Sequence, residues 1–439
     1  MATINRVSEK DRIAVLDVLR GISILGIFFL NILYMGNTIF WQLDPRLLGW
    51  SGSDRATFAF LTVFLDGTQR GLFQLLFGAT VMILSAPAMR PDAPVEIADS
   101  YYRRYIWLLL FGLFDVFVVA WDGDFLHPYA IAALFLFPLR RLHPGLLFVL
   151  GLSLTIGIAA IGSVDYSQRA ALQTVAESAT AASAHHVPLT PAQDAAAKQW
   201  TELQSSIEVP KAMLDAEREA HADGPVATWT WLREAWLDLQ QQDWFSFDIF
   251  RESITTMLIG MAFFRWGITQ GLRTRRFYMA LLLVGYGFGL AARAVDVTQL
   301  MTFSPVPRLS WITSEGARLA VTIGHLALIN LIFTTAPGKR LLQPFKAAGR
   351  LALSLYFTES LVGMWLLFSR LGLNLWAHFG WAKLTCVAVI VGAVLLIAAN
   401  LWMRFFVMGP FEWLWRSLTH CRPQPFRRSA LAQGKVLRI

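Results

Sequence analysis

Apolar stretches long enough to cross a membrane recur along almost the whole chain. A transmembrane helix needs about 20 predominantly apolar residues, and the chain has ten stretches of this kind, several of them interrupted by charged residues. They cover residues 13–35, 56–85, 105–121, 126–139, 145–163, 247–267, 277–294, 312–334, 351–370 and 384–408. This pattern predicts an all-α polytopic membrane protein, a bundle of about ten transmembrane helices.

One connection is much longer than the others and differs in composition. Between Asp165 and Phe245 there are 12 acidic residues against 5 Lys and Arg, with Ala-rich and Gln-rich stretches between prolines. Residues 192–207 and 229–239 fit helices, and the second carries three tryptophans that suit a membrane surface or a cap over a substrate entrance. The sequence therefore predicts four parts: transmembrane halves at 1–164 and 247–410, a helical insertion at 165–246, and a basic tail at 411–439.

The composition and the positions of the charges exclude several classes of protein. Hydrophobic residues make up 55% of the chain and charged residues 15%, whereas a soluble domain has about 25% charged residues. The net charge of +8 comes largely from Lys and Arg in alternate short loops, where the positive-inside rule acts. Ten spans with both termini in the cytoplasm put these loops beside the anionic lipid of a bacterial inner membrane and put the insertion in the periplasm. Topology explains the charge, so nucleic acid is not an expected partner.

Charged residues inside the spans are candidate sites, because a charge at this depth is costly unless it is paired or hydrated. Asp17 and Arg20 share a face of the first span, and Asn31, eleven residues after Arg20, has nearly the same azimuth. Asp66 and Arg70 are four apart in the second span. Each set suits either a structural salt bridge and hydrogen bond or a binding site for substrate or cofactor.

The eighth and ninth spans contain further polar residues. Glu315, Arg318 and His325 follow spacings of three and seven and can line one stripe, as a proton relay or anion site or as a closed structural network. Glu359 has no cation within one helical turn. Either another helix supplies its partner, or its carboxyl stays protonated and is available as a general acid or base.

The short turn at 121–129 combines Asp122, Asp124 and His127. Two carboxylates and an imidazole within six residues suit a polar acceptor molecule. Their spacing matches no standard metal motif, so no metal is expected. The two cysteines, Cys386 and Cys421, are far apart in the sequence and suggest neither a disulfide nor a cluster.

Residues spread along the chain resemble the YeiB-like family of bacterial integral membrane proteins, a family of unknown function. The resemblance covers all but the insertion, and its residues lie in four spans, one turn and the end of the last span. They are Leu16, Asp17, Arg20, Gly21, Ile24, Leu25, Gly26, Asn31, Leu76, Phe77, Gly78, Ala79, Trp121, Asp122, Gly123, Asp124, Gly260, Met261, Ala262, Gly349, Arg350, Ala352, Leu353, Gly409, Pro410, Glu412, Trp413 and Arg416.

The first span also looks like the first helix of transmembrane acetyltransferases related to the lysosomal heparan-α-glucosaminide enzyme. This resemblance implies acetyl-CoA bound on the cytosolic side and a sugar acetylated on the other. The more distant acyltransferase-three enzymes have a histidine where this chain has Asn31, which cannot act as a general base but can donate to an oxyanion. Close relatives in the YeiB-like family have a histidine at the position of Asp115 and an amide at that of Glu359. Both residues are therefore candidates for handling protons.

These observations favour a membrane acyltransferase that moves an acyl group from cytosolic acyl-CoA to an envelope glycan, lipid or small molecule. Arg20 and Arg70 are expected to hold phosphate or the thioester carbonyl, and Asp115, His325 or Glu359 is expected to be the base. A proton-coupled exporter of a small or lipidic compound, using Asp66, Glu315 and Glu359, is the alternative. A non-catalytic lipid-binding protein is a third possibility, and small residues on the spans permit a homodimer.

Overall fold

The computed structural model describes residues 14–90, 94–242 and 245–428, and helices form the framework of all three ranges. In these ranges the only β-type pairing is an isolated bridge between Phe406 and Arg427. The α-helices are α1 Ala14–Gly36, α2 Gly52–Phe64, α3 Thr68–Ser85, α4 Val95–Phe114, α5 Leu126–Leu136, α6 Pro144–Ala184, α7 Pro191–Ser205, α8 Lys211–Asp223, α9 Pro225–Gln242, α10 Phe245–Arg265, α11 Arg275–Leu300, α12 Ser310–Phe333, α13 Ala336–Arg350, α14 Ala352–Leu361, α15 Trp381–Phe405 and α16 Pro410–His420. The all-α prediction is confirmed.

Among the described residues, six helical segments are long and apolar enough to cross a membrane. They are Ala14–Gly36, Gly52–Met89, Pro144–Ala184, Arg275–Leu300, Ser310–Phe333 and Trp381–Phe405. The most apolar part of α1 is 67% buried, whereas the corresponding parts of α6, α11 and α15 are at most 22% buried. Apolar helices with exposed faces need a lipid environment, so this is a polytopic membrane protein with α1 in its interior.

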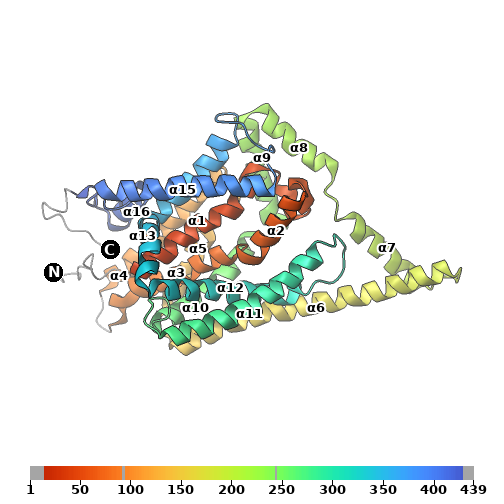
Figure 1. The fold of residues 1–439 in the computed structure, drawn as a ribbon, viewed down its shortest axis with the longest axis horizontal. Coiled ribbons are helices and arrows are strands. Elements are labelled where there is room, and N and C mark those ends of the chain that lie inside the picture. The colour runs from red at the N-terminus through yellow and green to blue at the C-terminus, as the bar shows by residue number, and fades with distance from the viewer. Residues whose placement is uncertain (1–13, 91–93, 243–244, 429–439) are drawn as a thin grey trace.

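Six of the ten predicted spans coincide with these segments, and the other four fall on α4, α5, α10 and α14. Two of the six also differ in course from the prediction. The second span, predicted as one helix over 56–85, is broken into α2 and α3 at Gly67, whose positive φ of 67° favours glycine. The fifth span does not end at 163 but continues as α6 to Ala184, across the predicted start of the insertion. Figure 1 shows α6, in yellow, extending beyond the bundle toward α7.

Two pairs of glycines bring helices into backbone contact. A Cβ on Gly21 would lie 2.0 Å from the carbonyl oxygen of Phe345, and one on Gly349 would lie 1.8 Å from that of Asp17, so any side chain would separate α1 from α13. Gly78 and Gly260 do the same for α3 and α10. Such small-residue crossings are typical of membrane helices. These glycines belong to the residues that carry the family resemblance, and they explain that part of it as packing.

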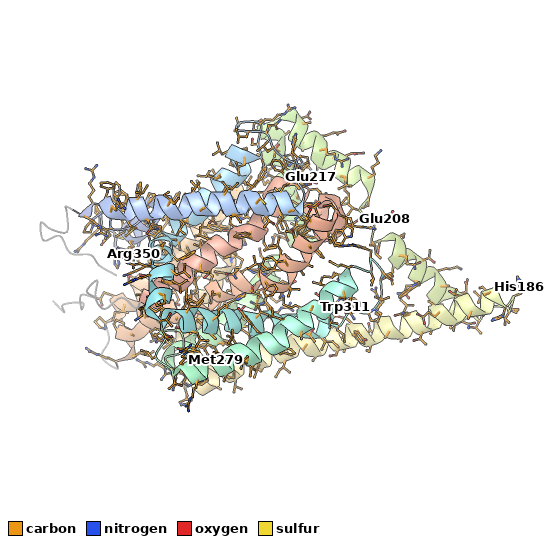
Figure 2. The ribbon with its side chains drawn as sticks, viewed as in Figure 1. His186, Glu208, Glu217, Met279, Trp311 and Arg350 are labelled. Carbon is orange, nitrogen blue, oxygen red and sulfur yellow. The ribbon has the colours of Figure 1, made fainter. Side chains whose placement is uncertain are left out.

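The insertion docks on one end of the bundle. The predictions of helices at 192–207 and 229–239 are confirmed by α7 and α9. In α8, the Glu217 carboxylate accepts hydrogen bonds from the Thr38 hydroxyl and from the Ile39 N–H at 3.0 Å. Figure 2 shows Glu217 at this end of the molecule and Arg350 at the other. The predicted cytoplasmic termini, Met1 and Ile439, lie outside the described residues.

Candidate functional site

A cavity of about 350 Å³ lies among α1, the α2–α3 break, the 121–125 turn, α9 and the start of α10. Its volume is at the lower end of the range for small-molecule sites. The cavity is lined by Gly26, Ile27, Leu30, Asn31, Tyr34, Gln42, Leu43, Leu65, Asp66, Gly67, Gln69, Arg70, Trp121, Asp122, Gly123, Asp124, Phe125, Leu239, Asp248 and Ile249.

Five of the predicted site residues meet in this cavity although they come from three separate segments. Asn31 comes from α1, Asp66 and Arg70 from the α2–α3 junction, and Asp122 and Asp124 from the turn before α5. Asp248 also lines the cavity, so the lining contains four aspartates and one arginine. Carboxylates and amides surrounded by aromatic rings suit a small ligand with several hydroxyl or amino groups.

Asp66 and Arg70 do not form the pair that their spacing suggested. Because the helix breaks at Gly67, the two residues do not share a helical face; Asp66 lies 3.8 Å from Arg293 of α11. Arg70 instead makes a two-point ion pair with Glu252 of α10, with Nε at 2.9 Å and Nη2 at 2.8 Å from the carboxylate oxygens.

Beside the cavity, Asp124, His127 and Ser246 form a continuous chain of hydrogen bonds. His127 Nδ1 lies 2.7 Å from Asp124 Oδ2, and His127 Nε2 lies 2.8 Å from Ser246 Oγ. Asp124 is itself part of the cavity lining, and Asp248 in the lining follows Ser246 on the first turn of α10. A carboxylate, an imidazole and a hydroxyl within these distances are the components of an activated nucleophile or a general base.

The surroundings of Asp124 determine which ring nitrogen of His127 carries the proton. Asp124 accepts hydrogen bonds from the His127 backbone N–H at 3.1 Å and from the Tyr356 hydroxyl at 2.7 Å. The carboxylate is therefore an acceptor, and Nδ1–H of His127 donates to it. In the neutral ring, Nε2 is then free of a proton and accepts from the Ser246 hydroxyl.

Helix α9 of the insertion covers this chain of hydrogen bonds. Trp236 packs edge-on against the His127 ring at a centroid distance of 6.0 Å, and Leu239 lines the cavity. Trp229 Nε1 donates to the Phe117 carbonyl at 3.1 Å and fixes the helix on the bundle. Helix α9 therefore lies over one side of the cavity.

A second group of charges forms a closed network behind the cavity. Arg318 donates to Glu315 at 2.6 and 2.9 Å, and its Nη1 lies 3.7 Å from Glu252, which thus lies between Arg70 and Arg318. Gln74 Nε2 donates to Glu252 at 2.7 Å. Sequence reasoning missed Glu252, although a carboxylate within an apolar span was a signal of the kind that identified the other residues.

His325 belongs to the α2–α3 break and not to the Arg318 network. Its Nε2 lies 2.9 Å from the carbonyl oxygen of Phe64, so this nitrogen carries the proton, and Nδ1 accepts from the Tyr286 hydroxyl at 2.7 Å. The carbonyl that it satisfies is at the end of α2, where the helix leaves backbone acceptors without intrahelical partners.

The remaining predicted residues lie away from the cavity lining. Asp115 is fully buried, and its Oδ2 accepts from Ser360 at 3.2 Å. Glu359 of α14 is 1% exposed, and no hydrogen-bond partner for either carboxylate oxygen is found among the described residues. Arg20 donates to Asp17 at 3.3 Å and to Thr80 at 3.4 Å. It lies about 16 Å along α1 from Asn31, since each helical residue rises about 1.5 Å.

Comparisons with known proteins match this chain over nearly its full length. The family described as "Protein of unknown function (DUF418)" matches residues 263–422. The uncharacterized protein YxaH of Bacillus subtilis (strain 168) is 27% identical over 98% of this chain and 99% of its own length. The uncharacterized protein YeiB of Escherichia coli (strain K12) is 26% identical over 93% of this chain and 96% of its own. The chain therefore resembles YxaH and YeiB over nearly its whole length, and its C-terminal part matches the DUF418 family.

The DUF418 match covers a defined part of the architecture. It begins near the end of α10 and continues through α16, so it includes His325, Glu359 and the α13 helix that packs on α1. The cavity and the Asp124–His127–Ser246 chain come before residue 263, in a part of the chain that the matches to YxaH and YeiB include. No solved structure matches the chain.

Proposed function

We propose that this protein is a membrane acyltransferase that moves an acyl group from an acyl-CoA thioester to an acceptor hydroxyl or amine. The acceptor is an envelope glycan, a lipid or a small polar molecule. The observation that supports the proposal is the Asp124–His127 pair beside a cavity of small-molecule size. Acyl transfer requires a base at the attacking group, and a histidine oriented by a carboxylate supplies one.

The cavity residues divide into groups with different tasks. Asn31, Asp66 and Asp122 offer oxygens to the hydroxyl or amino groups of an acceptor, and Arg70, fixed by Glu252, offers guanidinium N–H groups to a carbonyl oxygen. His127 Nε2 takes the proton of the hydroxyl that attacks the acyl carbonyl. In this proposal the base is His127, and Asp115, His325 and Glu359 have other roles.

A cavity of about 350 Å³ accommodates an acceptor and an acyl group but not a whole nucleotide in addition. We therefore propose that the nucleotide part of acyl-CoA stays at the opposite end of the bundle, where Arg20 is the candidate for its phosphates. The basic loops support an inner-membrane location with that end facing the cytoplasm. The insertion and the cavity then face the periplasm.

Proton-coupled transport is the second candidate, and Glu359 is the observation that favours it. A buried carboxylate in an apolar helix, without a hydrogen-bond partner among the described residues, is typical of a proton-carrying site. Transport predicts substrate movement without consumption of acyl-CoA and a dependence on Glu359 instead of His127.

The test uses the full-length protein in lipid nanodiscs with radiolabelled acetyl-, butyryl- and palmitoyl-CoA and a panel of sugars, amino sugars and glycerol. We expect release of free CoA and labelled acceptor, both lost in His127→Gln and retained in the matched control His325→Gln. Failure of the protein to bind or consume any acyl-CoA would overturn the proposed function. Flux of the same panel into proteoliposomes, compared between wild type and Glu359→Gln, would then test transport.

A further inference from the structure

Ser246 is placed as a nucleophile and not only as a hydrogen-bond partner. Its Oγ lies 2.8 Å from His127 Nε2, and the opposite ring nitrogen lies 2.7 Å from Asp124. Both distances fall within the range for an activated nucleophile and its oriented base. The three residues come from two distant parts of the chain, with the serine on α10 and the other two at the start of α5.

Asp124 and His127 are both buried and fixed by hydrogen bonds. Asp124 is fully buried and accepts three hydrogen bonds, from the backbone and ring N–H of His127 and from the Tyr356 hydroxyl. His127 is 5% exposed and lies under Trp236. A buried carboxylate that fixes the imidazole tautomer and stabilises the imidazolium is the arrangement that serine hydrolases and transferases share on unrelated folds.

The position of Ser246 within its helix suits the charge that forms during acyl transfer. Ser246 lies in the first turn of α10, where the helix dipole carries partial positive charge that favours an oxyanion. Its backbone N–H donates to Gln240 Oε1 of α9 at 3.0 Å, which ties the nucleophile to that helix. Asp248 and Ile249, on the same turn, line the cavity in which the acceptor is proposed to bind.

We propose that Ser246 carries the acyl group as a covalent ester during transfer; this rests on the proposed function. Ser246 Oγ attacks the thioester carbonyl while His127 Nε2 takes the hydroxyl proton. The carbon–sulfur bond breaks, and the leaving thiol takes that proton. The acceptor hydroxyl or amine then attacks the seryl ester, His127 takes its proton, and Oγ leaves and recovers the proton. Nothing is oxidised or reduced, and the enzyme returns to its starting state.

The experiment labels the nanodisc-embedded full-length protein with a fluorophosphonate probe, which reacts with activated serines. Peptide mass spectrometry locates the adduct in wild type, Ser246→Ala, His127→Gln and the matched control Ser253→Ala. Ser253 lies two turns along the same helix and is fully buried. We expect an adduct on Ser246, at least tenfold less labelling in His127→Gln, and unchanged labelling in Ser253→Ala.

Ser246→Cys provides a second measurement that does not depend on the serine probe. Incubated with acetyl-CoA, this variant is expected to gain the mass of one acetyl group on residue 246 as a thioester. No adduct on Ser246 in wild type and no acetyl on the cysteine variant, with both proteins folded by thermal melting, would overturn the proposal.

The outcomes separate this inference from the proposed function. If Ser246→Ala transferred acyl groups as fast as wild type, the covalent step would be wrong and direct transfer would stand. If Ser246 reacted with the probe and hydrolysed p-nitrophenyl acetate while acyl-CoA stayed intact, the nucleophile would stand and the acyl-CoA donor would be wrong.

Discussion

Two histidines inside the helical bundle are each hydrogen-bonded through both ring nitrogens, but to different partners. His127 has a carboxylate on Nδ1 and a serine hydroxyl on Nε2, whereas His325 has a backbone carbonyl on Nε2 and a tyrosine hydroxyl on Nδ1. A carboxylate stabilises the protonated ring, so His127 can accept a proton during a reaction. A carbonyl at a helix end needs a donor at all times, so His325 serves the α2–α3 break.

The partners of a histidine inside the bundle, more than its depth, indicate its task. From the sequence, His325 was the more prominent of the two, because it lies deep in a span with Glu315 and Arg318 on the same stripe. In the structure Arg318 bonds to Gln74 and Thr256 and not to His325, whereas His127, in the first turn of α5, bonds to Asp124 of the cavity lining.

Replacing each of the two histidines by glutamine is expected to give the largest difference in turnover. His127→Gln removes the base, and we expect acyl-CoA turnover to fall about 10³-fold, since a positioned general base contributes roughly 10²–10⁴-fold. His325→Gln is expected to keep turnover and to lower the free energy of unfolding by about 1 kcal/mol, because one amide cannot reproduce the hydrogen bonds of both ring nitrogens, to the Phe64 carbonyl and the Tyr286 hydroxyl. CoA release and thermal melting measure the two effects. Equal loss of turnover in both variants would contradict the distinction.

Asp124→Asn tests the carboxylate partner of His127 and is expected to have a smaller effect on turnover. The amide lacks the charge that stabilises the imidazolium, and we expect turnover to fall about 10²-fold, within the range given by general-base catalysis. Tyr356→Phe is the control, because it removes one donor to Asp124 but leaves the carboxylate and His127 in place. Single-turnover rates are the measurement, and a larger loss in Tyr356→Phe than in Asp124→Asn would count against the assigned role of Asp124.

The ion-pair network of Arg70, Glu252 and Arg318 gives a prediction about stability. Glu252→Gln leaves Arg70 and Arg318 without their shared carboxylate, and we expect a cost of about 2–3 kcal/mol, below the value for a fully buried pair because Arg70 is partly exposed. Glu315→Gln is the matched control and is expected to cost less, because Arg318 keeps Glu252. Unfolding of the two variants in mixed micelles tests the order. The opposite order would show that Glu252 does not bridge the two arginines.

A third histidine, His221, lies where α8 docks on the bundle. Its effect on the pH dependence of docking is expected to be the smallest of those predicted. Its ring stacks on Trp376 at a centroid distance of 3.8 Å, and burial lowers the pKa of His221 to about 4. Burial raises the pKa of Glu217, four residues earlier on α8, to about 7. The lowered pKa of His221 weakens docking as the pH falls from 6.5 toward 4. The raised pKa of Glu217 weakens docking as the pH rises from 4.5 toward 7.

These two dependences oppose each other, so wild type is expected to show almost constant docking between pH 4.5 and 6.5. Glu217→Gln is expected to lose docking as the pH falls through this window, and His221→Phe, which keeps the stacked ring, to lose it as the pH rises. Limited proteolysis of the α7–α8 connection across pH measures docking. The same pH profile in all three proteins would refute the assignment of these groups.

The sequence was sufficient for the features that depend on one helix at a time. Apolar length predicted the membrane helices, and the stretches between prolines in the insertion predicted α7 and α9. Asn31, Asp66 and Arg70 were recognised because polar residues are rare inside spans, and Asp122 and Asp124 because two carboxylates and a histidine share one short turn. Their meeting in one cavity follows from their lying toward the same end of their respective helices.

The sequence was insufficient wherever partners lie on different helices. Ser246 is an isolated serine at the start of a span, and only the placement of α10 against α5 brings it to His127. The Asp66–Arg70 pair failed because a single glycine changed the helical phase between them. Rotation and tilt of helices decide these contacts, and neither can be read from spacing along one chain segment.

Helix α6 is much longer than a membrane is thick. Its 41 residues measure about 60 Å at 1.5 Å per residue, twice the roughly 30 Å of a hydrocarbon layer. Its outer end, close to His186 in Figure 2, therefore stands about 30 Å outside the bilayer core. The inner half is wedged against neighbouring backbones at Gly151 and Gly162, where a Cβ would lie 2.8 Å from Thr255 O and 1.7 Å from Trp311 O. A sideways force on the outer end thus acts as torque on α10 and α12, and mechanical load far from the membrane reaches the helix that carries Ser246.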